Sequence, residues 1–186
     1  MKYYQLTDDI NFPHRWYLGE IIDAEDNWQF ILNGKVDESS LKIPFHIRVY
    51  QDGLSTDYTE NGAFNIPIVS ERVKLQLGGI ENLQFIPVVI EGKRTDLGYF
   101  IMVVGIKLDC VDEKLSEFGK FAVNDPVRPD LAGQYSWFTK LIIDPQRVNG
   151  ENIFRIGRTS SYLVVSEKVK DAFEDIGVTG AKFIEV

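Results

Sequence analysis

Short apolar runs alternate with polar stretches along most of the chain, and this pattern predicts many strands and few helices. Residues 83–90 and 97–111 are rich in β-branched and aromatic side chains, and the polar residues 91–96 separate them. A β-hairpin with two largely buried strands is therefore predicted. Further on, residues 112–119 fit a short helix or a loop, 124–130 an exposed connection with two prolines, and 139–143 a strand.

The first 60 residues have a weaker pattern. Short strands are expected at residues 1–6, 15–22, 28–32 and 45–50. The pair Asn33-Gly34 fits a hairpin turn, and residues 57–65 are expected to form a loop.

A block of six residues occurs twice in the chain, 96 positions apart. Residues 69–74 read VSERVK and residues 165–170 read VSEKVK, so five of the six positions match. Downstream, residues 80–88 align with 178–186 at an offset of 98. The chain therefore contains an internal repeat.

Each copy has the pattern of a strand, a helix and a second strand. An apolar run ends at Ser70 or Ser166, residues suited to cap a helix, and a glutamate follows each serine where the helix dipole favours it. The prediction is an α+β fold, a mainly β core with two similar strand-helix-strand units at about residues 66–88 and 162–186. A single compact domain, 1–186, is expected, with possible halves 1–96 and 97–186 that share a sheet.

The two predicted helices differ in length. In the second copy an apolar stripe is formed by Val169, Ala172, Phe173 and Ile176, and Gly177 can take the left-handed position after the helix. The first copy stops at Gly78-Gly79, so its helix should be about half a turn shorter.

Composition points to a reducing compartment. Cys110 is the only cysteine, so it can form neither an intramolecular disulfide nor a cysteine-based metal site. No stretch resembles a signal peptide or a membrane span, and a cytoplasmic location is expected.

Charge argues against some partners and for others. The net charge is −8, and residues 1–60 hold 11 acidic and 5 basic side chains, a net charge of −6. A field of this sign repels phosphate backbones and anionic lipids, so neither nucleic acid nor membrane is expected as a partner. The acidic excess either keeps the protein in solution or forms a face for a basic partner.

Motifs for catalysis, metals and cofactors are missing from the sequence. His14 and His46 lack metal-ligand spacing, and His46 fits the solvent face of a strand. There is no nucleophile elbow and no glycine-rich phosphate loop, and the apolar setting of Cys110 predicts an inert thiol. No catalytic residue, metal or cofactor is therefore predicted.

The C-terminal half resembles a known family. Its motifs are LIIDP at 141–145, IFRI at 153–156, VVSEKVK at 164–170 and IGVTGAKF at 176–183. In this order they resemble the eleventh-numbered immunity-protein family of bacterial polymorphic toxin systems, formerly a domain of unknown function. The resemblance covers about residues 97–186, whereas residues 1–60 match much less clearly. It implies a cytoplasmic, non-enzymatic protein that neutralises a cognate toxin.

The predicted binding site lies in the N-terminal third, where aromatic and acidic residues are interleaved. Aromatic side chains can anchor an interface, while acidic ones steer a basic partner toward it. The candidates are Trp16, Glu20, Asp23, Glu25, Asp26 and Trp28. The alternative is that the aromatics belong to the core and the acids to loops. For function, the alternatives are an interaction or scaffold domain unrelated to toxins, or an enzyme without a recognised motif.

Overall fold

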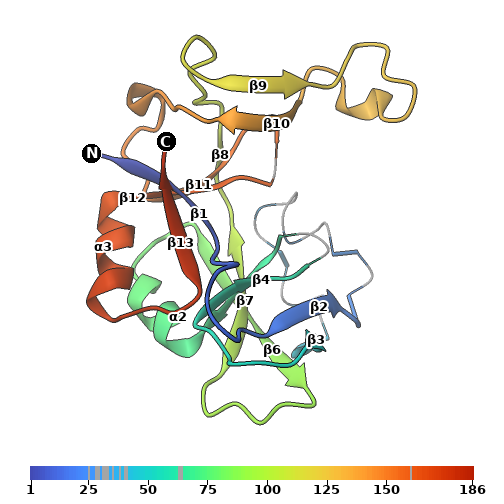
Figure 1. Ribbon diagram of the computed structural model, residues 1–186, viewed down its shortest axis with the longest axis vertical. Coiled ribbons are helices and arrows are strands. Elements are labelled where there is room, and N and C mark those ends of the chain that lie inside the picture. The colour runs from blue at the N-terminus through green and yellow to red at the C-terminus, as the bar shows by residue number, and fades with distance from the viewer. Residues whose placement is uncertain are drawn as a thin grey trace.

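The computed structural model describes residues 1–24, 26–27, 30, 34, 36–37, 39, 42–62, 65–159 and 161–186. The protein is mainly β (Figure 1), broadly in line with the predicted α+β class. Two α-helices are described, α2 (Glu71–Leu77) and α3 (Glu167–Asp175), with the 3-10 turns η2 (Pro129–Leu131) and η3 (Pro145–Arg147). The helix in the first copy is two residues shorter than that in the second, as predicted.

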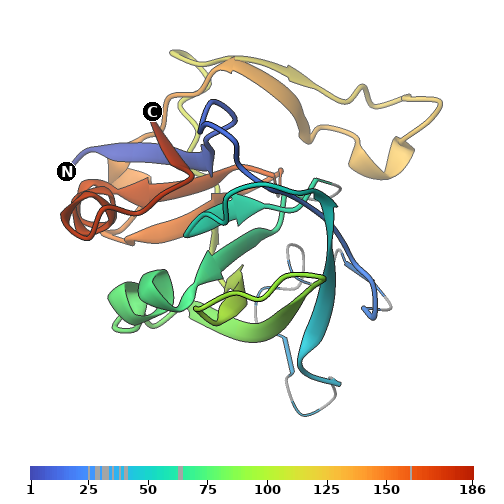
Figure 2. The same cartoon turned by 60° about the horizontal axis from the view of Figure 1, so that its bottom comes forward.

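The described strands form three sheets. The six-stranded sheet has the order β2 (Tyr17–Ile21), β3 (Phe45–Gln51), β6 (Leu83–Glu91), β7 (Tyr99–Val104), β5 (Pro67–Ser70) and β4 (Tyr58–Glu60). The five-stranded sheet has the order β13 (Ala181–Glu185), β1 (Tyr3–Asp8), β12 (Leu163–Ser166), β11 (Ile153–Ile156) and β8 (Lys107–Leu108). A two-stranded sheet, β10 (Tyr135–Lys140) and β9 (Glu117–Lys120), lies beyond the five-stranded sheet (Figure 2).

Central strands are buried on both faces, which explains their continuous apolar runs. In β7, Ile101 and Val103 belong to one core cluster, while Met102 and Val104 belong to a second cluster with residues of α2, α3 and the five-stranded sheet. Val164 of β12 faces a third cluster, toward β9 and β10. Alternate side chains therefore join the layers into one stack.

The two repeat segments have the same order of elements and the same strand directions. In the first, β5, α2 and β6 follow one another, and β7 lies between the two strands, antiparallel to both. In the second, β12, α3 and β13 follow one another, and β1 lies between the strands in the same way. That the segments superpose as copies of one unit stays a prediction.

The serines at the helix starts occupy the cap position but do not cap with their hydroxyls. Ser70 and Ser166 are fully buried and have extended backbones, and neither side chain bonds the first turn. Each hydroxyl donates instead to the residue just before a neighbouring strand, Asp57 Oδ1 before β4 at 2.7 Å or Asn152 Oδ1 before β11 at 2.9 Å. Gly177 has the predicted left-handed conformation, with φ of 62°.

Several predicted boundaries need correction. The hairpin of β6 and β7 is confirmed, but its second strand ends at Val104 and the chain then enters the five-stranded sheet as β8. The expected loop at 57–65 contains β4, because its residues pair with β5. Of the strand expected at 139–143, only residues 139 and 140 lie in a strand, at the end of β10. The strand and turn expected at 28–34 fall mostly outside the described residues.

Strand pairing crosses the expected boundary between the halves in both directions. The N-terminal strand β1 lies in the sheet of β11, β12 and β13, and β7, which follows residue 97, lies between β5 and β6. This exchange favours one cooperative unit, which a single unfolding transition would test.

Candidate partner-binding site

An open pocket of about 630 Å³ lies between the end of β1, strand β2, the end of β3 and β4 with its following loop. Three carboxylates, Asp8, Glu20 and Glu60, are among its lining residues. No lysine, arginine or histidine occurs among the described residues that line it. The pocket is therefore suited to a cationic or hydrogen-bond-donating group.

Exposed apolar side chains form part of the pocket wall. Ile10 is 67% exposed, Tyr17 37% and Tyr50 85%. Tyr17 and Tyr50 come from the paired strands β2 and β3, in which Leu18 and Ile47 face the core. Exposed apolar groups gathered beside a concave site are typical of interaction surfaces.

A buried arginine lies beside the pocket and binds one of its carboxylates. Arg15 is 3% exposed, and its guanidinium bonds Asp8 Oδ2 at 2.5 Å and Thr59 Oγ1 at 2.8 Å. It also donates to the carbonyl oxygens of Asp9 and Trp16. Burial raises the pKa of Asp8, although the arginine opposes that rise. The guanidinium of Arg15 is therefore engaged by a carboxylate, a hydroxyl and main-chain carbonyls of the protein itself.

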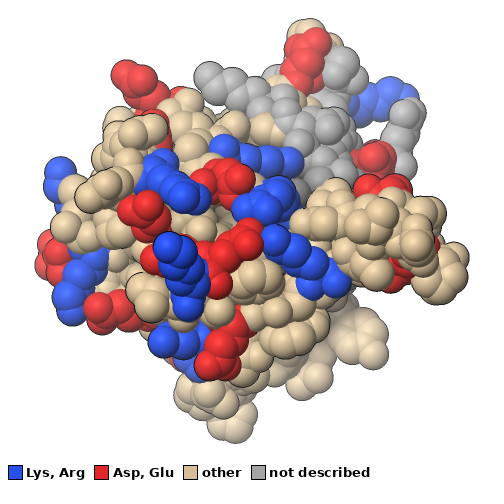
Figure 3. Space-filling model, turned by 90° about the horizontal axis from the view of Figure 1, so that it is seen from above, with Lys and Arg blue, Asp and Glu red and all other residues tan. Residues whose placement is uncertain are grey.

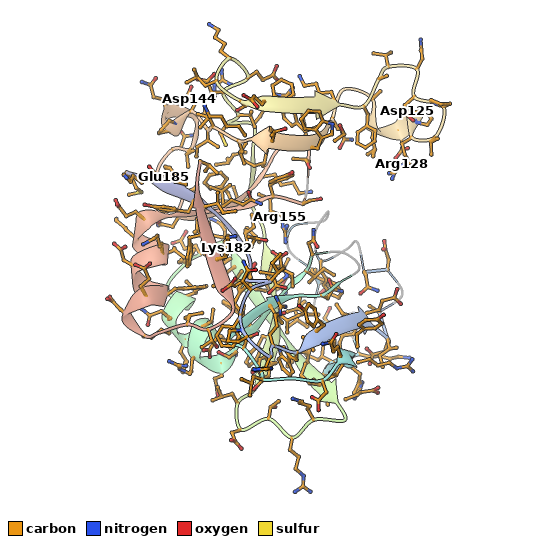
Figure 4. The ribbon with its side chains drawn as sticks, viewed as in Figure 1. Asp125, Arg128, Asp144, Arg155, Lys182 and Glu185 are labelled. Carbon is orange, nitrogen blue, oxygen red and sulfur yellow. The ribbon has the colours of Figure 1, made fainter. Side chains whose placement is uncertain are left out.

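Glu60 is the pocket residue whose ionisation is most altered. Burial raises the pKa of its carboxyl to about 7, and the Tyr58 hydroxyl donates to Oε1 at 3.0 Å. Asp8 raises the pKa further, while Arg155 and Arg15 act in the opposite direction. Arg155 is fully buried on β11 in the middle of the molecule (Figure 4). Glu60 is therefore only partly charged near neutral pH.

The prediction that Trp16 anchors a partner is wrong, because this side chain is fully buried. Its ring packs edge-on against Tyr99 with centroids 5.2 Å apart, and Nε1 donates to Thr56 Oγ1 at 3.2 Å. Trp16 is thus a core residue, in agreement with the alternative interpretation of the aromatics.

The acidic candidates have different surroundings. Glu20 is exposed and lines the pocket, and Asp26 is also exposed. Asp23 is exposed too, but it accepts bonds of 2.8 Å from the main chain and from Nδ1 of His46. Burial opposes ionisation of Asp23, yet these bonds outweigh it and lower its pKa. Glu25 and Trp28 lie outside the described residues.

Sequence reasoning missed most of the pocket. In β3, His46, Arg48 and Tyr50 lie on the polar side of an alternating pattern. An aromatic residue on that side could have indicated an exposed contact surface. Glu60 gives no such signal, because its strand is expected to be a loop and its pKa depends on residues distant in the sequence, such as Asp8 and Arg155.

The opposite end of the molecule carries a second, polar pocket of about 410 Å³. On the face seen in Figure 3, basic and acidic side chains are interspersed. Arg158 pairs with Asp109 at 2.7 Å and with Glu113 at 3.1 Å, and Lys120 pairs with Glu113 at 2.9 Å. Bonds from Tyr135 and Lys120 lower the pKa of Glu113 to about 2. These charges satisfy one another, so this pocket is less suited to a charged partner.

A projecting loop beside β9 and β10 exposes apolar side chains as well. Val123 is 80% exposed and Val127 79%. Asp125 and Arg128 lie at the far end of this projection (Figure 4), where Arg128 pairs with Asp130 at 2.8 Å.

Within the described ranges, no group of three or more histidine, cysteine, aspartate or glutamate side chains is arranged to hold a metal. None of the described helices is long and apolar enough to cross a membrane. Burial raises the pKa of the Cys110 thiol to about 11, in keeping with an inert core residue.

Comparison with known families defines the class of protein. Residues 8–186 match the model of an immunity protein family, and because this match covers nearly the whole chain, the protein belongs to the Imm11 family of immunity proteins. The resemblance of residues 97–186 is confirmed, and the match also includes residues 8–60. This family is not enzymatic, and membership implies a toxin partner. No curated protein sequence matches the chain.

Proposed function

We propose that this protein neutralises a cognate toxin domain of a bacterial polymorphic toxin system by binding it directly, in the cytoplasm. Family membership supports a toxin partner. The contact face is the acidic surface around the pocket, because carboxylates and exposed tyrosines meet there and none of its described lining residues is a lysine or an arginine. This combination is the observation that carries the proposal.

The partner surface is basic. Residues 1–60 carry a net charge of −6, and the exposed acids Glu20 and Asp26 lie in the same segment. Charges at the rim of an interface accelerate association more than they slow dissociation. The toxin therefore meets this face under electrostatic attraction that salt weakens.

The test is binding to the toxin domain encoded beside this gene. In one variant Glu20→Gln and Asp26→Asn are combined, whereas Asp23 is left unchanged because it holds His46. We expect an association rate about 3- to 10-fold slower and a flatter salt dependence.

The matched control combines Glu81→Gln and Glu117→Gln, which removes the same charge from two exposed acids outside the pocket. Equal association rates for both double variants would refute the acidic face. Failure of the unaltered protein to bind or inhibit the toxin would refute neutralisation itself and favour a scaffold role.

A further inference from the structure

We infer that the pocket receives a basic side chain of the toxin, arginine in preference to lysine, as the anchor of the interface. The inference rests on the proposed function, because it names the chemical group that the acidic face takes from its partner. An interface commonly depends on a few residues that fill pockets, and arginine is prominent among them.

Charge complementarity is the first argument. Asp8, Glu20 and Glu60 contribute three carboxylates to one concave site, and the part of its lining that the structure describes contains no basic side chain. Arg15 and Arg155, the cations that act on Glu60, are buried beneath the surface, and Arg15 is already bonded to Asp8. An incoming cation therefore contacts Glu60 and Glu20, whose carboxylates Arg15 does not bond.

The aromatic wall is the second argument, and it favours arginine. Tyr17 already carries the Arg15 guanidinium over its ring, 4.6 Å from the centroid. Tyr50, with 85% of its surface exposed, offers a further ring beside the same pocket. A planar guanidinium stacks on a tyrosine and also bonds a carboxylate with two N–H groups, which an ammonium does not.

Proton linkage gives the inference a distinctive signature. Glu60 is faced by Asp8 from β1, Arg15 from the segment before β2, Tyr58 from β4 and Arg155 from β11. A bound cation stabilises the ionised form of Glu60, so binding releases a proton. With a free-state pKa of about 7, affinity should rise about tenfold from about pH 6 to about pH 8 if only the ionised form binds.

The inference can be tested without the toxin. N-acetyl-arginine methylamide is titrated into isotope-labelled protein while backbone NMR signals are followed, and the neutral isostere N-acetyl-citrulline methylamide serves as the control ligand. We expect saturable shifts confined to residues around Tyr17, Gly19 and Glu60, and binding of citrulline at least about 10-fold weaker. Shifts scattered over the surface, or equal binding of both compounds, would overturn the inference.

Variants then connect the pocket to the partner. Glu60→Gln retains an oxygen acceptor for the Tyr58 hydroxyl, and Glu81→Gln removes one exposed charge outside the pocket. We expect Glu60→Gln to weaken arginine binding and toxin binding about 10-fold or more and to flatten the pH dependence, while Glu81→Gln behaves as wild type.

The two proposals can fail separately. If the wild type neutralises the toxin and Glu60→Gln binds it equally well, the pocket inference is wrong and the proposed function stands. If the wild type does not bind the toxin, the proposed function is wrong, and the arginine titration alone decides whether the pocket binds a guanidinium.

Discussion

Two four-stranded groups in this molecule share one arrangement, although the chain reaches them by different routes. One is β4-β5-β7-β6 with helix α2, and the other is β11-β12-β1-β13 with helix α3. All neighbouring strands within each group are antiparallel. At the helix starts, the N–H of Glu71 donates to the Gly98 carbonyl at 2.8 Å and that of Glu167 to the Lys2 carbonyl at 2.9 Å.

The groups differ in where their third strand comes from. In the first group β7 follows β6 along the chain. In the second group β1 comes from the N-terminus, and its Tyr4 pairs with Glu185 of β13. The two ends of the chain lie side by side (Figure 1), with Val186 N–H donating to the Tyr3 carbonyl at 3.1 Å. The second group is therefore assembled from both ends of the chain, whereas the first is built from one continuous stretch.

The groups also differ in the acceptor beside each helix start. Within the described residues, the side chain of Asn152 accepts one hydrogen bond, from Ser166. The carboxylate of Asp57 accepts hydrogen bonds from Ser70, Arg72 and Thr179. Thr179 follows α3, so Asp57 joins the first group to the second. The carboxylate gives this contact more bonds than an amide oxygen provides in the other group.

The largest effects are expected from the paired helix residues Phe173 and Leu77, which are equivalent in the repeat and almost fully buried. Phe173→Ala should lower the free energy of unfolding by about 3 to 5 kcal/mol and Leu77→Ala by about 2 to 4 kcal/mol, because each leaves a cavity. Chemical denaturation measures both. A loss below about 1 kcal/mol at either site would show that its helix does not support the shared core.

The next largest effect on stability should distinguish the two hydrogen-bond acceptors beside the helix starts, Asp57 and Asn152. Asp57→Ala should cost about 3 kcal/mol, because it leaves the buried Ser70 hydroxyl and the Thr179 groups without an acceptor, whereas Asn152→Ala should cost about 1 kcal/mol. Thermal and urea unfolding of both variants provide the comparison. Equal losses in the free energy of unfolding would mean that Asp57 stabilises the protein no more than Asn152 does.

Glu60, in the first group, should make the stability of the protein depend on pH. Because its pKa is raised from 4.5 to about 7, the folded protein binds more protons than the unfolded chain between these values. The free energy of unfolding therefore falls as pH rises through this window, and the full loss is reached above about pH 7.

Glu60→Gln removes this titration and keeps the acceptor for Tyr58. The variant should be more stable than wild type by about 2 kcal/mol at about pH 8, with a smaller difference at about pH 5. Denaturant titrations at both pH values measure the change. A difference that does not depend on pH would contradict the ionisation of Glu60 described above.

A circular permutant tests whether the two four-stranded groups form regardless of the order of their strands along the chain. Val186 is joined to Met1 by a short Gly/Ser linker, and the chain is opened between Arg94 and Thr95 in the turn after β6. The second group then becomes continuous and the first becomes divided. We expect a folded protein within about 2 kcal/mol of wild type, judged by cooperative unfolding, because the opened turn is largely exposed. Loss of cooperative unfolding would show that the order along the chain matters.

Local patterns in the sequence predicted much of this fold. The hairpin of β6 and β7 and the left-handed Gly177 depend on neighbouring residues, and the structure bears both out, while the repeat as two copies of one unit stays a prediction. Strand β4 is only three residues long and forms because it pairs with β5. Local sequence patterns do not predict this pairing. The pocket is similarly non-local, because it joins the end of β1 to β2, β3 and β4.

The smallest effects should come from the equivalent lysines of the two helices. Lys74 lies over the Phe100 ring, 3.9 Å from its centroid, and Lys170 lies over the Tyr4 ring at 5.5 Å and pairs with Glu174 at 2.7 Å. Such partly exposed contacts contribute little, so Lys74→Ala and Lys170→Ala should each lower the free energy of unfolding by about 0.5 kcal/mol.

The lysine pair sharpens the comparison because salt should affect its members differently. Lys170 adds an ion pair to its ring contact, so the cost of Lys170→Ala should shrink in about 1 M salt, while that of Lys74→Ala should change less. Denaturation midpoints with and without salt measure this difference. If either substitution costs as much as Phe173→Ala, the helix face assigned to the core is wrong, because a half-buried lysine would then contribute as much as the buried apolar stripe.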